Sequence, residues 1–264
     1  MKTLKNKINI FLILILSIGI LLFSLFLINN YSLNMKDLYV IKSTNLIEDP
    51  SFENFNDTAK DCCNNLPGEA NISSKKNIHA IEGEYCLQLS SNNHCACINK
   101  PTINFNKESP SLLTFFYKGD NPRFCIWFEG DKRCSPNKEL ETTNEWTQQK
   151  EILIPTEKTE GISLYFYADS DGTKTVTNYY DDLQIKQLMA INNTYNFQDN
   201  ENYIIKTKAD NEVNGERISE IKNGEAYFLI QGEPNITIKF PLTELIIILI
   251  MLIIIIRLTK HEKH

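Results

Sequence analysis

Two long apolar runs lie near the ends of the 264-residue chain, and they constrain its fold more than any other feature. The first runs for 19 residues over 10–28 and is broken only by two serines and one glycine. At 1.5 Å per residue its helix would extend about 28 Å, which matches the hydrocarbon core of a membrane. The second contains twelve consecutive Leu, Ile and Met residues, 245–256. We predict transmembrane helices over 10–28 and 241–257; the alternatives are a cleaved signal peptide for the first and a buried core element for the second.

Basic residues flank both runs on the sides that face the chain ends. They are Lys2, Lys5, Lys7, Arg257, Lys260 and Lys263. Because cytoplasmic segments next to membrane spans carry an excess of Lys and Arg, the tails 1–9 and 258–264 are predicted to be cytoplasmic. Residues 31–240 then lie outside the cytoplasmic (plasma) membrane.

The charge balance of the middle of the chain excludes some classes of function. The whole chain has 27 Lys and Arg against 33 Asp and Glu, a net charge of −6. Without the six basic residues and Glu262 of the two tails, 21 basic and 32 acidic residues remain, which gives −11. An acidic middle argues against a nucleic-acid partner, because that binding needs clustered Lys and Arg. The sequence also lacks G-x-S-x-G, H-E-x-x-H and phosphate-binding glycine motifs, so no catalytic residue is assigned and a non-enzymatic role is expected.

Short alternating runs separated by polar turns fill residues 44–188, after a linker over 29–43. No stretch of helical length has a 3.6-residue period, so the fold class is predicted to be all-β, an antiparallel jelly-roll β-sandwich. The expected strands are Glu84–Ser90, Ser111–Tyr117, Arg123–Phe128, Gln149–Ile154, Ser163–Ala168 and Tyr179–Lys186.

Five ordered segments of this region resemble carbohydrate-binding modules of the galactose-binding-like jelly-roll type. They are Asn45–Ile47 with Ser51–Asn54, Gly83–Leu89, Leu112–Lys118, Trp146 before Ile152–Pro155, and Tyr180–Ile185. The resemblance covers 45–187 and implies the sandwich fold and a glycan as ligand. Because this fold carries many ligands, the resemblance does not specify which sugar.

Residues 189–240 form a second, smaller juxtamembrane β-unit in the predicted organisation. Asn214-Gly215 and Asn223-Gly224 separate alternating apolar runs, as type I′ hairpin turns do. The tail from Val213 to the second apolar run resembles that of membrane glycosyltransferase-like proteins of the YfhO type. This resemblance implies a cell-envelope setting without their catalytic domain.

The resemblance also implies a structural calcium ion where the first and last strands meet. The matching carboxylates are Glu53, Asp181 and Asp182. Calcium prefers oxygen ligands, which fits this set. The alternative is that these carboxylates only cap strand ends.

A sugar site needs an aromatic face and a few planar polar groups beside it. The predicted ligand-binding residues are Trp127, Arg123, Tyr117, Tyr165 and Tyr167. Trp146 is expected to serve packing instead.

Seven cysteines in an exported segment indicate disulfides. Cys125 and Cys134 face each other across a predicted hairpin and are expected to pair. Cys62 and Cys63 are expected to pair with Cys95 and Cys97 in an order that the sequence leaves open, and Cys86 is expected to be free. The alternative is a zinc site that uses these four cysteines and His94, although the C-x₂₋₄-C spacing is missing. The sequons at Asn30, Asn56, Asn71, Asn192 and Asn235 also mark a candidate glycoprotein.

Together these features predict a membrane-anchored, non-enzymatic module that recognises cell-envelope or environmental glycans. The alternative function is an accessory subunit of a membrane glycosyltransferase or other envelope complex, with a protein as its partner.

Overall fold

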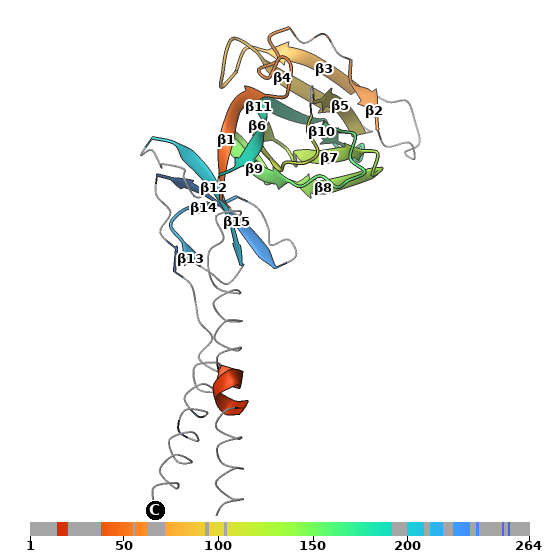
Figure 1. The fold of residues 1–264 in the computed structure, drawn as a ribbon. Coiled ribbons are helices and arrows are strands. Elements are labelled where there is room, and N and C mark those ends of the chain that lie inside the picture. Colours follow the sequence, from red (N-terminus) through yellow and green to blue (C-terminus); the bar gives the residue numbers. More distant parts are fainter. Residues whose placement is uncertain are drawn as a thin grey trace, which may run out of the picture.

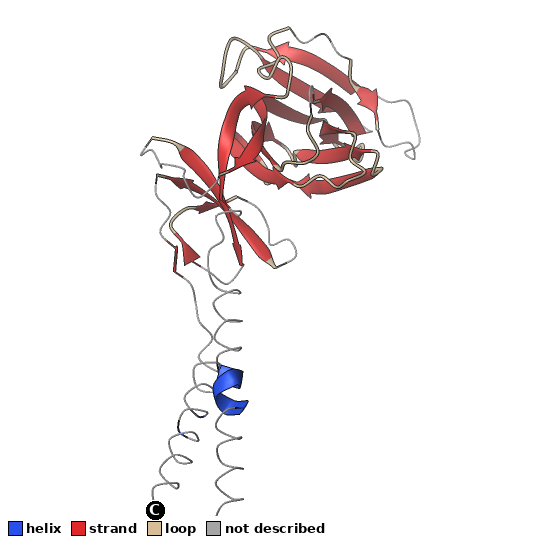
Figure 2. Ribbon diagram, in the orientation of Figure 1, coloured by secondary structure: helices blue, strands red, loops and turns tan. Residues whose placement is uncertain are grey.

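The computed structural model describes most of the chain between the two apolar runs. The described residues are 15–20, 38–54, 56, 58–62, 72–92, 95–102, 105–191, 200–208, 212–218, 224–232, 236–237, 250 and 253. They are nearly all in β-strands, and every strand pair is antiparallel (Figures 1 and 2). The all-β prediction is confirmed for this part of the chain.

The larger sheet, called sheet A here, has nine strands. Its central strand β11 is flanked by β1 and by the two branches β4-β3 and β6-β9. The strands of this part are β1 (Leu38–Asn45), β3 (Ile72–Asn77), β4 (Cys86–Ser91), β6 (Ser111–Gly119), β9 (Thr143–Leu153) and β11 (Val176–Ala190). Beyond β1 the sheet continues through β12 (Asn202–Lys208), β15 (Glu225–Gln231) and β14 (Glu216–Arg217).

The second sheet, sheet B, has five strands in the order β2-β5-β10-β7-β8. They are β2 (Lys60–Asp61), β5 (Cys95–Pro101), β7 (Arg123–Glu129), β8 (Arg133–Glu139) and β10 (Gly161–Asp169). A further two-stranded pair joins β13 (Glu212–Val213) to β16 (Ile236–Thr237).

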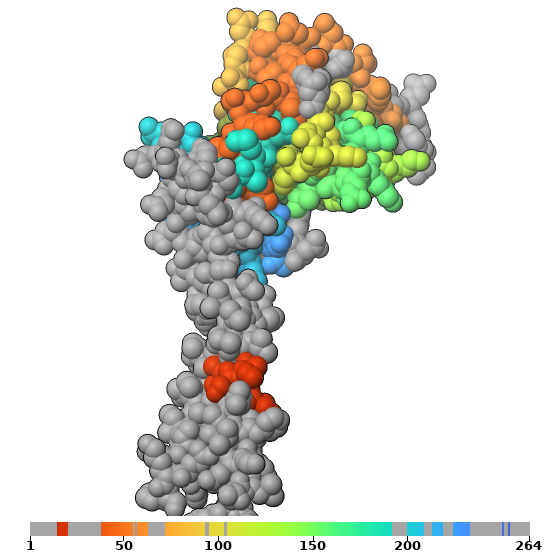
Figure 3. All heavy atoms as spheres, in the orientation of Figure 1, coloured from red at the N-terminus to blue at the C-terminus, as the bar shows by residue number. Residues whose placement is uncertain are grey.

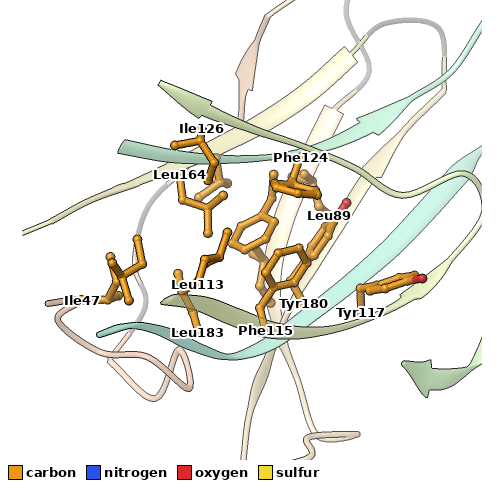
Figure 4. Close-up of a cluster of buried hydrophobic side chains, with 14 of the residues drawn as sticks. Ile47, Leu89, Leu113, Phe115, Tyr117, Phe124, Ile126, Leu164, Tyr180 and Leu183 are labelled. Carbon is orange, nitrogen blue, oxygen red and sulfur yellow. The ribbon is translucent and has the colours of Figure 1, made fainter. Parts of the chain in front are cut away.

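The main core lies between sheets A and B. Alternate residues of the facing strands point into it, as in Ile162, Leu164, Phe166 and Ala168 of β10, all of which are buried. Figure 4 shows Phe115, Phe124 and Tyr180 among the aliphatic side chains of this cluster. The arrangement is a β-sandwich, as the alternation predicted.

The C-terminal unit is continuous with the sandwich because β1 pairs with β11 on one side and with β12 on the other. Figure 3 shows the atoms of 38–54 beside those of β11. Leu38 at the start of β1 is buried in a second cluster with Ile191, Tyr203, Ile205 and Ile230. The segment predicted as a linker over 29–43 therefore contains most of a sheet strand, because its apolar residues have the C-terminal unit to pack against.

The six expected strands all occur, with boundaries that differ by a few residues. Of the two predicted transmembrane segments, the structure describes only 15–20, 250 and 253. Among the residues that it describes, no helix has the length and apolarity needed to cross a membrane.

Candidate functional site

The side of sheet B that faces away from the core carries a group of aromatic and polar side chains. On β10, Tyr165 and Tyr167 alternate with the core residues, and on β7, Arg123 and Trp127 do the same. All four are partly exposed. We call this group, together with Asn99, Asn137 and Asp169, the outer face of sheet B.

The strand register places these side chains in rows across the sheet. The rows centred on β10 are Cys97–Tyr167–Arg123, Asn99–Tyr165–Cys125 and Pro101–Ser163–Trp127. On β8, Asn137 lies opposite Cys125 and Cys134 lies opposite Trp127. Four of the five side chains predicted to bind a ligand therefore share one face.

Arg123, the first residue of β7, is held firmly at one end of this face. Its guanidinium carbon lies 3.8 Å from the centre of the Tyr167 ring. It also donates hydrogen bonds to Asp169 Oδ2 and, at 3.2 Å, to Asn137 Oδ1. The planar guanidinium is thus stacked and oriented before any ligand arrives.

The two tyrosines form a stacked pair beside Arg123. Their ring centroids are 6.4 Å apart and the rings are inclined by 26°. Burial raises the pKa of Tyr167, so its hydroxyl stays protonated and can act as a donor or acceptor near neutral pH.

Tyr180 and Asn178 of β11 support this face from beneath. The Tyr180 hydroxyl donates to the Tyr167 carbonyl at 2.6 Å, and it accepts from the Arg123 backbone N–H at 3.3 Å. Asn178 Nδ2 donates to the same Tyr167 carbonyl at 3.0 Å. Both side chains are fully buried and do not contact solvent. Their hydrogen bonds fix this end of β7 and β10.

Tyr117 does not belong to this face. It is 5% exposed and points from β6 of sheet A into the main core (Figure 4). Burial, and secondarily the charge of Glu141, raise its pKa. The prediction failed because Tyr117 is on the same side of β6 as Leu113 and Phe115, four and two residues earlier, and this side faces the core.

Two disulfides lie on sheet B. Cys125 bonds to Cys134, as predicted, and Cys62 bonds to Cys97, which resolves one of the pairings that the sequence left open. Cys95 is also disulfide-bonded, whereas Cys63 and His94 lie outside the described residues. Bonded cysteines are not free thiolate ligands, which argues against the zinc alternative.

Cys86 is a free thiol, as predicted, and it is fully buried. Burial, with a smaller contribution from the charge of Asp181, raises its pKa to about 12. It therefore behaves as a small core residue.

The carboxylates predicted to bind calcium hold the loop between β3 and β4. Glu53 Oε1 accepts from the backbone N–H groups of Glu84 and Tyr85 at 2.8 and 2.9 Å. Asp181 Oδ2 accepts from those of Ile81 and Glu82 at 2.6 and 3.1 Å.

These contacts leave a poor fit for a calcium ion. Each of the two oxygens already accepts two N–H groups, which occupies the lone pairs that a cation would need. Asp181 Oδ1 accepts from the Asp182 N–H at 2.8 Å, and Asp182 Oδ1 accepts from Gln184 Nε2 at 2.6 Å. Among the described residues, no group of three or more His, Cys, Asp or Glu is arranged to hold a metal. Glu53 and Asp181 therefore serve as backbone clamps.

Replacing Asp181 with asparagine should lower the free energy of unfolding by about 2 kcal/mol, because the amide nitrogen would face a backbone donor that stays unpaired. Asp182→Asn, in a side chain that is partly exposed, is the matched control and should have a much smaller effect. Thermal unfolding with and without a calcium chelator measures both. A chelator that lowers the melting temperature of the wild type as much as Asp181→Asn does would show that calcium binds there after all.

Three side chains of this face were not predicted from the sequence. Asp169 follows Tyr165 and Tyr167 with the same alternation, so this parity could have identified it. Asn99 and Asn137 reach the face only through the pairing of β5 and β8, which no local pattern specifies.

No family model and no curated protein matches the sequence. Among solved structures, similarity was found to a family 61 carbohydrate-binding module in complex with β-1,4-galactotriose, with 14% identity, 55% of this chain and 99% of that chain covered, and a TM-score of 0.39. A family 11 module from Clostridium thermocellum has 12% identity, covers 58% and 100%, and has a TM-score of 0.38. The tailspike protein 4 of bacteriophage CBA120 has 10% identity and a TM-score of 0.43; 54% of this chain aligns with only 21% of that one. At these values none of the three assigns a ligand to this chain.

Proposed function

We propose that this chain is a non-catalytic glycan-binding protein and that the outer face of sheet B is its binding site. The observation that carries the proposal is the gathering of Trp127, Tyr165, Tyr167 and Arg123 on one partly exposed face of one sheet. Aromatic rings stack on the apolar faces of sugar rings, and planar polar groups bind the hydroxyls.

The polar groups of this face suit a ligand that is rich in hydroxyls. Arg123 supplies donors, while Asn99 and Asn137 supply both donors and acceptors. Arg123 is already paired with Asp169, so a neutral sugar keeps this ion pair intact, whereas an anionic one would compete with the carboxylate.

The strand order supports a jelly-roll assignment for the sandwich. Strands β4-β11-β6-β9 and β5-β10-β7-β8 form the facing sheets. Sequential strands from β4 to β11 thus alternate between the sheets, except that β7 and β8 form a hairpin within sheet B, as expected for two Greek keys.

We further propose that the domain is displayed outside the cytoplasmic membrane and held there by the two apolar runs. In the described helical turn 15–20, Ile15 and Ile18 are about half exposed, at 51% and 50%. Such exposure of large apolar side chains suits a lipid environment. The basic tails support cytoplasmic termini, and the resemblance of the tail supports an envelope setting.

Binding of the full chain, kept in a neutral detergent, to a panel of neutral oligosaccharides tests the proposal. Trp127→Ala and Tyr165→Ala should each weaken binding at least tenfold, the equivalent of about 1.4 kcal/mol. Tyr85→Ala removes a partly exposed ring from sheet A's side of the molecule and should leave affinity unchanged. A ligand that binds equally to all three variants would contradict the proposal.

A further inference from the structure

A polar groove of about 440 Å³ lies on the opposite side of the sandwich, where sheet A continues into the C-terminal unit. Its walls come from β1, β6, β9 and β11 of the sandwich and from residues at or before the start of β12 and in β15. The side chains that matter for its chemistry are Lys42, Lys150, Lys186, Ser43, Gln148 and Gln184. Sites of this volume accept small ligands or single units of a polymer.

The groove exists because β1 leaves its neighbours after its first half. Its pairing with β12 ends at Val40, which lies opposite Tyr203. Its register with β11 is broken between Ile41 and Asn45. The bulged segment between them forms one wall, and bulges of this kind often occur beside binding sites.

Three lysines converge on this groove although the middle of the chain is strongly acidic. Lys150 forms an ion pair with Glu216, which offsets its charge. Among the described residues, Lys42 and Lys186 make no hydrogen bond or close ion pair, although the charge of Lys186 acts on Glu82 and opposes the rise in the pKa of that carboxyl. The acidic residue of the wall, Glu201, accepts the Tyr203 hydroxyl at 2.7 Å.

This combination specifies the chemistry of a ligand. Three lysines against one carboxylate, Glu201, leave the lining of the groove with an excess of positive charge, which favours a bound anion. The amides of Gln148 and Gln184 and the hydroxyl of Ser43 can both donate to and accept from hydroxyl groups. A ligand with one anionic group and several hydroxyls satisfies both sets.

We propose that this groove is a second glycan site, specific for an acidic sugar unit that carries a carboxylate or a phosphate ester. It is separate from the outer face of sheet B, whose arginine is already paired with a carboxylate. One chain could then hold a neutral and an acidic glycan at once.

Calorimetric titration of the full chain in neutral detergent tests this proposal with trigalacturonate, glucose 1-phosphate and neutral galactotriose as probes. At least one acidic probe should bind, more weakly as salt rises. The Lys42→Gln, Lys186→Gln double variant should reduce that affinity at least tenfold. Lys158→Gln, at an exposed lysine of the β9–β10 loop, should leave it unchanged.

The arms of the experiment separate the outcomes. Binding of trigalacturonate alone assigns the site to carboxylates, and binding of glucose 1-phosphate alone assigns it to phosphate esters. The proposal is overturned if neither acidic probe binds, or if the double variant binds like the wild type. An equal melting temperature for the double variant and the wild type confirms that any loss is not caused by unfolding. If the temperature falls, the single Lys42→Gln variant of the exposed lysine is titrated instead.

Discussion

Replacing Phe166 with alanine should lower the free energy of unfolding by about 4 kcal/mol, because a buried aromatic ring is lost and a cavity remains. Phe166 is fully buried at the centre of the main core. Its ring stacks on Tyr180 with centroids 4.2 Å apart and meets Phe115 edge to face at 5.1 Å. Because Tyr180 also fixes the ends of β7 and β10, the loss should extend to the outer face of sheet B.

The neighbouring Tyr165 provides the matched control for Phe166. It lies on the same strand but points to the opposite side of the sheet. Tyr165→Ala should cost at most about 1 kcal/mol of stability, since a partly exposed ring loses less burial. Chemical denaturation measures both variants, and equal losses would mean that the assignment of the two faces of β10 is wrong.

Replacing Lys138 with methionine should lower stability by about 3 kcal/mol, because the buried Glu151 charge loses its ion pair with Lys138. Glu151 lies on β9 of sheet A and is fully buried. Its Oε2 lies 2.8 Å from Lys138 Nζ of β8, so the ion pair joins the two sheets.

Replacing both partners at once distinguishes the cost of an unpaired charge from the value of the pair. The Lys138→Met, Glu151→Leu double variant should recover most of the lost stability, since apolar replacements of a buried pair are often neutral. Double-mutant analysis by denaturant titration gives the coupling. A double variant that is less stable than Lys138→Met would contradict this account of the pair.

The residues of the outer face of sheet B were predicted from their chemistry, and the alternation along their strands explains why four of them share one face. On β7 and β10 the period of two separates Phe124, Ile126, Leu164 and Phe166, which are buried, from the aromatic and polar residues that are not. Placing them on neighbouring strands requires the pairing of β7 with β10, which 31 residues separate along the chain and which no local pattern specifies. Tyr117 was misplaced because its strand was predicted without assigning its inward side.

Other features depend on contacts that are distant in sequence. The β1 strand was predicted as a linker because its burial depends on β12, more than 150 residues later. The groove beside it follows from a broken register, which leaves no mark in composition. Glu53 and Asp181 were predicted as calcium ligands. In the structure both accept hydrogen bonds from backbone N–H groups of residues 81–85, a role that the sequence did not predict.

The most direct test of the proposed glycan site uses the two tryptophans of the chain, which lie on different sheets. A Trp146→Phe chain reports only Trp127 on the outer face of sheet B, and a Trp127→Phe chain reports only Trp146 on sheet A. Titration with a neutral oligosaccharide that binds the wild type should change the emission of the Trp127 reporter and leave the Trp146 reporter unchanged. A saturable change in the Trp146 reporter with none at Trp127 would contradict the assignment of this site to sheet B.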